Sequence, residues 1–251
     1  MNAGNRHIDL NADLGEGEPT DDALLEIVSS CNVACGGHAG DRESMLATIC
    51  AAAARGVAPG AHPSYPDREG FGRQGGFMDA ASLEPALERQ LADLLDVAAE
   101  AGVRIGHVKP HGALYNDAAR SRPLADAIAR VVAALDGNLA IVGPPSSALD
   151  RAAADSGLGF IAEGFVDRAY QADGSLLPRS EPGAVYTEPA GAARQATSIA
   201  ADGCVIAAGG EVITLPVATL CIHGDTPGAV LSAKAVRTAL EAAGVRISAW
   251  A

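Results

Sequence analysis

Aromatic residues and long apolar runs are scarce in this chain, and both absences limit what it can be. Its 251 residues include four Phe, four Tyr and one Trp, although 48% are hydrophobic. The core must therefore consist mainly of Ala, Val, Leu and Ile. No run of about eighteen apolar residues is present, so we expect no transmembrane helix. The N-terminus also shows no apolar signal-peptide segment.

Basic residues are outnumbered by acidic ones, which excludes another group of functions. The 18 Lys and Arg residues against 31 Asp and Glu residues give a formal net charge of −13 at pH 7. Binding to nucleic acid needs a basic surface, and binding to an anionic membrane is favoured by one. We therefore expect neither nucleic acid nor a membrane surface as a partner.

The cysteines are few and lack the spacing of a metal or redox motif. There are five, at positions 31, 35, 50, 204 and 221, with no C-x-x-C pair among them. We expect reduced, mostly buried thiols, as in a cytoplasmic protein. A redox-active pair of Cys31 and Cys35 is the alternative, but no basic residue adjoins it in the sequence.

Short apolar segments alternate with amphipathic or Ala-rich segments along almost the whole chain. Strands are expected at 7–13, 31–35, 57–62, 103–109, 139–143, 159–166 and 219–223, and helices near 20–29, 42–55, 80–101, 121–135, 146–156, 189–201 and 227–243. This alternation predicts an α/β fold with a parallel sheet and crossover helices. Seven such units favour a closed or nearly closed barrel. We expect one domain over residues 1–251, with a β-hairpin insertion at 203–214 that turns at Gly209 and Gly210.

The segment 103–111, Val-Arg-Ile-Gly-His-Val-Lys-Pro-His, is the most informative in the chain. Side chains on a strand alternate between its two faces, so positions 103, 105, 107, 109 and 111 share one face. That face begins apolar and ends with His107, Lys109 and His111. A proline and a glycine then interrupt regular pairing. Three nitrogen-bearing side chains at a strand end indicate a site for an anion, a metal or a carbonyl group.

The first strand carries alternating acids and amides. Asp9, Asn11 and Asp13 share one face of the segment 7–13. A buried ionised carboxylate needs a partner, so this pattern favours a site over a purely structural strand. A solvent-exposed edge strand is the alternative. In parallel α/β barrels the active site lies at the carboxyl ends of the strands, where Asp13 is expected.

Polar residues beside Gly or Pro also follow the other strands. These are Asn32, His38, His62, Arg73, Asp167, Arg168, His223 and Asp225. His223 and Asp225 share a parity, so we expect the carboxylate to orient the imidazole. For Asp167 and Arg168 the alternative is a surface ion pair. For His62 the alternative is a histidine that its own loop backbone satisfies.

Together these side chains predict a hydrolytic site. Asp13, His38 and His62 form a set that suits a divalent transition metal. Lys109 can stabilise an oxyanion or phosphoryl group as an ammonium, or act as a nucleophile or base if it is neutral. His107, His111 and His223 are candidates for proton transfer. No G-x-x-x-x-G-K-[ST] loop is present and no G-x-G-x-x-G directly follows an expected strand, which argues against a self-contained P-loop ATPase and against a dinucleotide enzyme.

At the same segments the sequence resembles the LamB/YcsF family. The matching stretches are 9–16 (DLNADLGE), 32–41 (NVACGGHAGD), 60–63 (GAHP), 70–73 (GFGR), 107–116 (HVKPHGALYN), 165–170 (FVDRAY) and 221–225 (CIHGD). They span nearly the whole chain in family order, and the ten-residue stretch around Lys109 is highly specific.

The resemblance implies a single-domain (β/α)7 barrel of the glycoside hydrolase/deacetylase type. It also implies the role of the A subunit in a 5-oxoprolinase. Such an enzyme opens 5-oxo-L-proline (pyroglutamate) to L-glutamate with ATP, which the complex binds, together with partner subunits B and C. An activated lactam that carries a carboxylate and a phosphoryl group would explain why an acidic protein gathers Lys109, Arg73 and several histidines.

Under this interpretation each polar residue has an expected role. The catalytic residues are expected to be Asp13, Lys109, His111, His223 and Asp225, and the substrate-binding residues Asn11, Asn32, Arg73, His107, Asp167 and Arg168. The possible metal ligands remain Asp13, His38 and His62. The rival hypotheses are a stand-alone metal-dependent deacetylase or amidohydrolase of the same fold, and a non-catalytic metabolite-binding barrel.

The sequence departs from the family pattern at four positions. The family usually has an aromatic residue at Gly37, a small residue at Cys31, a glycine at Ser64 and an arginine at Gln74. We expect Gly37 and Ser64 to alter the shape of the pocket and Gln74 to remove one anion contact. These departures concern substrate preference more than reaction class.

Overall fold

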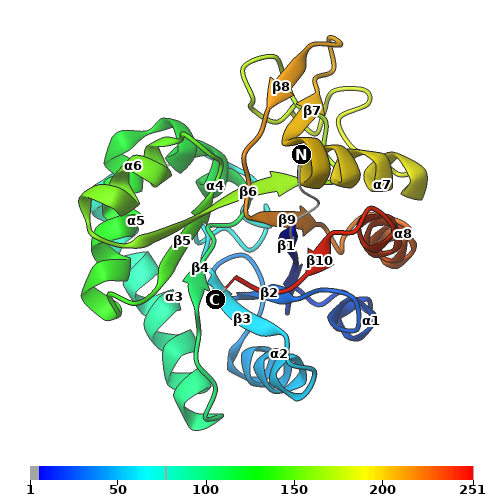
Figure 1. The fold of residues 1–251 in the computed structure, drawn as a ribbon. Helices are drawn as coiled ribbons and strands as arrows, with labels where there is room; N and C mark the ends of the chain where they lie inside the picture. Colours follow the sequence, from blue (N-terminus) through cyan, green and yellow to red (C-terminus); the bar gives the residue numbers. More distant parts are fainter. Residues whose placement is uncertain (1–5, 77, 251) are drawn as a thin grey trace.

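The predicted strands form a closed parallel barrel (Figure 1). The computed structural model describes residues 6–76 and 78–250. Within these ranges the barrel strands are β1 (His7–Leu14), β2 (Ser30–Ala34), β3 (Ala58–His62), β4 (His107–Val108), β5 (Ala140–Gly143), β6 (Gly159–Phe165) and β9 (Thr219–Ile222). Each strand pairs with the next in this order, and β9 pairs with β1 to close the ring. The expected seven-stranded barrel is confirmed.

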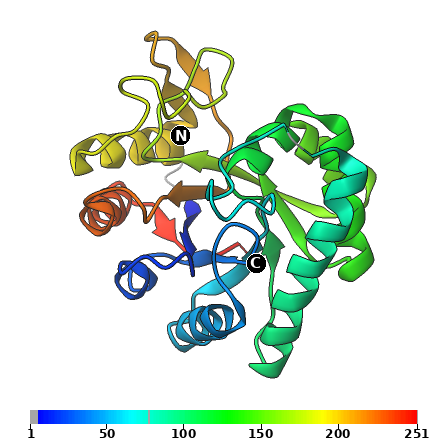
Figure 2. The ribbon, with the colours of Figure 1, turned by 180° about the vertical axis from the view of Figure 1, so that it is seen from behind.

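Helices surround the barrel on its outside (Figures 1 and 2). They are α1 (Asp21–Leu25), α2 (Arg42–Ala54), α3 (Ala80–Glu100), α4 (Gly112–Arg120), α5 (Arg122–Leu135), α6 (Ala148–Asp155), α7 (Pro189–Thr197) with a π-helical extension at Ser198–Asp202, and α8 (Ala229–Ala242). The start of α2 shows how sequence sets a boundary. The Asp41 side chain accepts a hydrogen bond from the backbone amide of Ser44, and the Ser44 hydroxyl accepts one from the backbone amide of Asp41. This reciprocal pair is a capping box.

The main apolar core lies between the strands and the helices, whereas the part of the barrel interior that β1 lines is polar. On β1 the apolar residues Leu10, Ala12 and Leu14 are fully buried in the hydrophobic core. The opposite face of the same strand carries Asp9 and Asn11, which are also buried. Asp9 accepts hydrogen bonds from hydroxyls on neighbouring strands and loops: Ser29, Ser30 and Thr219. Buried polar groups of this kind persist only when they are hydrogen-bonded to one another.

The expected strand at 103–109 is too long, because only His107 and Val108 are in β4. The amide of Val103 instead bonds back to the Ala98 carbonyl at the end of α3. Beyond β4 the amides of Lys109 and His111 bond to the Ala61 and Pro63 carbonyls, next to β3. The expected alternation is therefore kept from His107 to His111 although the regular strand has ended.

Other expected boundaries also differ from the structure. The helix expected at 20–29 ends at Leu25, because the chain must turn to begin β2 at Ser30. The helix α4 was not expected after the Pro-His-Gly sequence, and it buries Leu114 and Tyr115. A short strand β10 (Arg246–Ile247) pairs with the start of β1 outside the ring and was also not expected.

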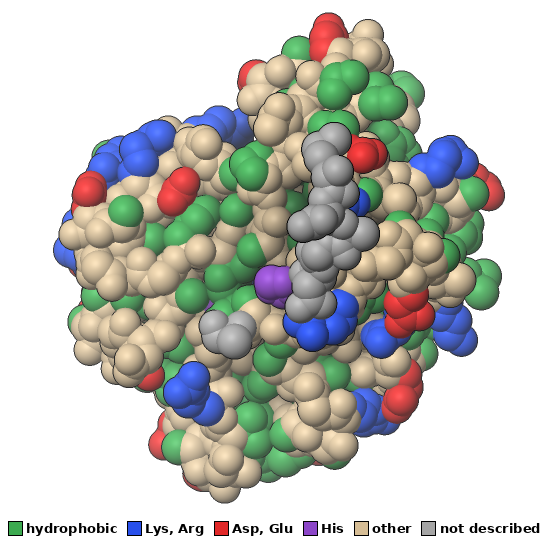
Figure 3. Space-filling view, in the orientation of Figure 1, with side chains coloured by type: hydrophobic (Ala, Val, Ile, Leu, Met, Phe, Trp, Pro, Cys, Tyr) green, Lys and Arg blue, Asp and Glu red, His purple; other side chains and the backbone are tan. Residues whose placement is uncertain are grey.

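The predicted hairpin insertion is confirmed. β7 (Cys204–Ile206) and β8 (Val212–Thr214) pair in antiparallel fashion, and the loop between them contains Gly209 and Gly210. In Figure 1 this hairpin extends away from the barrel, above β6 and α7. On the molecular face in Figure 3, Lys and Arg side chains are interspersed with Asp and Glu. Among the described helices, none combines the length and apolar character needed to cross a membrane.

A glycine on β3 is required by the packing of the barrel interior. A Cβ atom at Gly60 would lie 2.2 Å from Nε2 of His107, which is buried and 2.6 Å from Oδ1 of Asn32. We expect Gly60→Ala to lower the free energy of unfolding by about 1–3 kcal/mol, because the added methyl group would overpack the barrel interior against His107. Urea denaturation of the variant measures this change.

Gly137→Ala is the matched control for that substitution. Apart from its two chain neighbours, no heavy atom of the described residues lies within 4 Å of the Cβ position at Gly137, and its φ angle is outside the left-handed region. Its free energy of unfolding should change by less than about 0.5 kcal/mol. If both alanine variants unfold at the same urea concentration, the packing role of Gly60 is refuted.

Candidate active site

The carboxylate of Asp13 lies at the end of β1 between two nitrogen-bearing side chains. Its Oδ1 atom is 3.0 Å from Nζ of Lys109, and its Oδ2 atom is 3.3 Å from Nε2 of His62. Burial raises the pKa of a carboxyl group, but the charges of His62 and Lys109 outweigh burial and hold the pKa of Asp13 well below its usual range. Asp13 is therefore a fixed negative charge. The edge-strand alternative is wrong, because β1 pairs with both β2 and β9.

Lys109 lies inside the barrel, surrounded by acceptors. Its Nζ atom is 3.0 Å from Asp13 Oδ1, Glu163 Oε1 and Cys221 Sγ, and 3.4 Å from Asn11 Oδ1. Burial lowers the pKa of an amine, but the neighbouring acidic groups, Asp13 foremost, outweigh burial and raise the pKa of Lys109 well above its usual value. This environment favours the ammonium form over the neutral nucleophile. Lys109 then supplies a fixed positive charge.

His223 and Asp167 form a hydrogen-bonded pair at the ends of β9 and β6. Nδ1 of His223 lies 3.0 Å from both carboxylate oxygens of Asp167, which also accepts the His223 backbone amide. Burial raises the pKa of Asp167, but His223 outweighs burial and lowers it. A carboxylate only accepts, so Nδ1 carries the hydrogen and Nε2 is left to accept a proton. The partner that orients His223 is therefore Asp167, and the expectation that Asp225 does so is wrong.

Asp225 binds two arginines instead. It accepts from Arg73, which follows β3, and from Arg179 at 3.3 Å. Arg168 does not pair with Asp167 in the described structure; its guanidinium donates to the carbonyls of Ala184 and Leu177. The surface-pair alternative is thus wrong for Asp167, which is buried. Arg73 and Arg179 form a cationic edge that is suited to an anionic group.

Three of the predicted substrate-binding residues lie beneath the site. Asn32 donates to Asn11 Oδ1 and to Asp13 Oδ1, each at 2.8 Å, and Nε2 of His107 donates to Asn32 Oδ1 at 2.6 Å. Burial lowers the pKa of His107 to about 3, so this ring is neutral. Asn11, Asn32 and His107 support Asp13 and Lys109 from below and do not line the cavity that opens above them.

Three histidines gather beside Asp13 around a second carboxylate, Glu16. His38 Nε2 lies 2.9 Å from Glu16 Oε1, and His111 Nδ1 lies 3.0 Å from His62 Nε2. One ligand atom from each of Glu16, His38, His62 and His111 lies within 4.8 Å of the others, a grouping that fits a metal ion. The metal ligands expected from the sequence, Asp13, His38 and His62, do not form one such group. His38 is bonded to Glu16, whereas Asp13 is bonded to Lys109.

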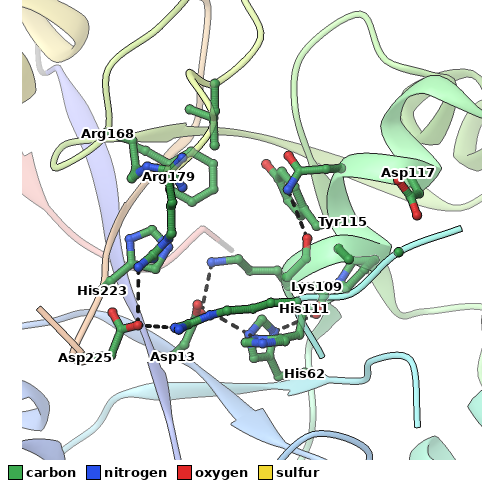
Figure 4. A pocket seen from close by; sticks show the side chains of 18 of the residues that line it. Asp13, His62, Lys109, His111, Tyr115, Asp117, Arg168, Arg179, His223 and Asp225 are labelled. Carbon is green, nitrogen blue, oxygen red and sulfur yellow. Dashed lines mark hydrogen bonds and ion pairs between the residues drawn. The ribbon is translucent and has the colours of Figure 1, made fainter. Parts of the chain in front are cut away.

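These groups converge on one cavity of about 410 Å³ (Figure 4). Its lining includes Asp13, Glu16, His62, Arg73, Lys109, His111, Tyr115, Phe165, Arg168, Arg179, His223 and Asp225. The ring of Phe165 stacks on His223 and lies 5.5 Å from Nζ of Lys109. The cavity therefore combines a fixed ammonium, an oriented imidazole and an arginine edge around an apolar ring. Such an arrangement suits hydrolysis of a small polar substrate with an anionic group.

Two departures from the family pattern are coupled to each other, and neither reshapes this cavity. A Cβ atom at Gly37 would lie 2.4 Å from both Ser64 Oγ and Gln90 Oε1. Ser64 and Gln90 thus occupy the space that a side chain at position 37 needs. Neither Gly37 nor Ser64 lines the active-site cavity, so their expected effect on its shape is wrong. Gln74 is exposed.

Several residues of the site were not predicted individually. Glu16 lies in the turn that follows β1, close in sequence to Asp13. A turn has no periodic pattern, so the sequence does not predict that the Glu16 side chain contacts His38. Glu163 was detectable as a lone acid on the strand expected at 159–166. Tyr115 was missed together with the helix that carries it. Arg179 lies in a loop between β6 and α7, where the sequence gives no periodicity to place it.

The family and the relatives of this chain agree with this architecture. The pattern of the LamB/YcsF family matches residues 8–251. The chain is 48% identical over 249 residues to the 5-oxoprolinase A subunit of Methylococcus capsulatus, and the match covers 97% of this chain and 96% of that protein.

Solved structures give the same result at the level of the fold. The crystal structure of a lactam utilization protein from Thermus thermophilus has a TM-score of 0.91 and 40% sequence identity, and the match covers 97% of this chain and 100% of that chain. A peptidoglycan deacetylase from Bacillus subtilis has a TM-score of 0.50 at 13% identity over 99% of this chain and 89% of that chain, a likeness in fold alone. The expected deacetylase type of barrel is confirmed, and the chain belongs to the LamB/YcsF family.

Proposed function

We propose that this chain is the hydrolytic A subunit of a 5-oxoprolinase. Together with partner subunits B and C and with ATP, it opens the ring of 5-oxo-L-proline to give L-glutamate. The observation that carries the proposal is the meeting of a fixed ammonium, Lys109, and an oriented imidazole, His223, in one cavity. The relative from Methylococcus capsulatus is named as the A subunit of 5-oxoprolinase, which supports both the substrate and the assembly with other subunits.

The charges of the cavity suit the ring opening of a lactam. In this proposal Nε2 of His223 takes a proton from water, whose oxygen adds to the ring carbonyl carbon. Lys109 stabilises the negative charge on the oxygen atoms around this carbon, including the phosphoryl group of the activated species. The ring C–N bond then breaks, and the nitrogen takes up a proton to become the amine of glutamate. A second water molecule hydrolyses the resulting acyl phosphate to the glutamate side-chain carboxylate and inorganic phosphate. Arg73 and Arg179 are positioned to bind the carboxylate of the substrate.

We assign the activation of the lactam by ATP to the partner subunits. A lactam carbonyl is a poor electrophile, and phosphorylation of it would lower the barrier to attack by water. The sequence has no phosphate-binding G-x-x-x-x-G-K-[ST] loop, so this subunit is proposed to receive the activated species. A cytoplasmic setting follows from the need for ATP and is consistent with the five free cysteines.

The proposal is tested by reconstitution with the partner subunits of the same organism. We expect glutamate to form from 5-oxoproline only when this chain, both partners and ATP are present. Deacetylase activity of this chain alone, sensitive to chelators and independent of ATP, would favour a stand-alone amidohydrolase instead. Binding of 5-oxoproline without turnover in the complete complex would favour a non-catalytic barrel.

His223→Gln tests the proposed general base. Glutamine keeps a polar side chain at this partly exposed position but cannot take up a proton at neutral pH. We expect kcat of the reconstituted complex to fall about 10²–10⁴-fold with little change in KM. His7→Gln, at the exposed start of β1, is the control and should leave kcat unchanged. An unchanged kcat in His223→Gln would remove this residue from the mechanism.

Lys109→Met tests the proposed fixed positive charge. The chain has one other lysine, Lys234, which is exposed on α8 and provides the control Lys234→Met. Removal of the ammonium leaves the buried carboxylates of Asp13 and Glu163 without their shared counter-charge, so we expect Lys109→Met to lose about 3–5 kcal/mol of unfolding free energy. Urea denaturation measures the loss. Adding Glu163→Gln should recover part of it, and no recovery would contradict the charge pairing.

A further inference from the structure

Two histidines of the site have one ring nitrogen fixed as a donor by the backbone. Nδ1 of His62 is 2.7 Å from the Lys109 carbonyl oxygen, and Nε2 of His111 is 2.9 Å from the Phe71 carbonyl oxygen. A carbonyl oxygen only accepts, so these two nitrogens carry hydrogen. In each neutral ring the other nitrogen then has a lone pair and no hydrogen.

Those two lone-pair nitrogens point at each other and at a carboxylate. Nε2 of His62 and Nδ1 of His111 are 3.0 Å apart. Oε1 of Glu16 lies 3.4 Å from the His111 nitrogen and 3.8 Å from the His62 nitrogen. Oδ2 of Asp13 also lies 3.3 Å from the His62 nitrogen, so four acceptors face one another in a buried space and repel unless a metal ion or a proton lies between them.

The spacing of the three atoms fits a metal ion. A point equidistant from the corners of a triangle with sides of 3.0, 3.4 and 3.8 Å lies about 2.0 Å from each corner, which is the usual bond length from Zn²⁺ to imidazole nitrogen or carboxylate oxygen. The hydrogen bonds from the far ring nitrogens to carbonyl oxygens are also the outer contacts that metal-binding histidines usually make.

His38 is excluded from the ligand set by its orientation. Its ring is stacked on that of His111, with centroids 3.6 Å apart and planes 3° apart, so the two in-plane lone pairs cannot meet at one ion. Nε2 of His38 is bonded to Glu16 instead, and His38 does not line the cavity. Glu16, His62 and His111 all line it.

We propose that Glu16, His62 and His111 bind one divalent transition metal ion of the Zn²⁺ class. This set differs from the Asp13, His38 and His62 set expected from the sequence. The ion lies at the wall of the cavity, so its remaining coordination positions face the substrate space, as in catalytic rather than structural sites. A bound ion would polarise a carbonyl group or a water molecule there. His38 is a positioning residue that holds Glu16.

The experiment measures metal binding in the absence of substrate, so its result does not depend on the proposed function. Chelator-treated full-length protein is titrated with Co²⁺, followed by visible absorption, and with Zn²⁺, followed by calorimetry. We expect one equivalent of either ion to bind and Zn²⁺ to raise the melting temperature. His62→Ala and His111→Ala should each lose this binding and the thermal shift.

Two further variants keep the test decisive if an alanine variant fails to fold. Glu16→Gln keeps the size of the side chain and should weaken Zn²⁺ at least tenfold, whereas His7→Gln, with an exposed histidine outside the site, should bind as the wild type does. Absence of Co²⁺ and Zn²⁺ binding in the wild type would overturn the proposal and assign the space to a proton on His62, which Asp13 and His111 would share. Binding that survives in Glu16→Gln and both alanine variants would also overturn it.

Discussion

The pairing of Lys109 with buried carboxylates is the interaction on which the rest of the structure depends. An ammonium group inside a barrel is unstable alone, and so are Asp13 and Glu163. Together they allow the barrel interior beside β1 to be polar from Asp9 to Asp13, where most barrels place packed apolar side chains. The side-chain amides of Asn11 and Asn32 then donate to the carboxylates of Glu163 and Asp13 on neighbouring strands, and Asn32 also donates to Asn11.

This polar interior also holds the reacting groups in place through hydrogen bonds within the protein. Asp13 and Lys109 are held on buried strand ends, while His223 is oriented by Asp167 from the neighbouring strand β6. Arg73 and Arg179 come instead from loops at the mouth of the cavity. The proposed reacting groups are thus held by the barrel, whereas the proposed substrate-binding arginines are held by loops. Changes in the loops can therefore alter substrate preference without displacing the reacting groups.

The sequence predicted the barrel and most of the site because both have periodic signals. Alternation on β1 and on 107–111 placed Asp13, Lys109 and His111 at one end of the barrel. Side-chain pairings between different strands and loops have no such signal. Whether His223 meets Asp167 or Asp225 depends on the neighbouring strand β6 and on two loop arginines. The role of Glu16 depends on the path of a turn after β1, which spacing alone does not describe.

One residue of this site belongs to two chemical systems at once. The side chain of Lys109 balances the carboxylates of the barrel interior, and its backbone carbonyl sets the tautomer of His62. A displacement of this single peptide would therefore change both the electrostatic field of the cavity and the direction in which an imidazole presents its lone pair. The proline that follows, at position 110, restricts the backbone dihedral angles of Lys109. The position of the Lys109 ammonium and the direction of its carbonyl group are therefore linked through one restricted residue.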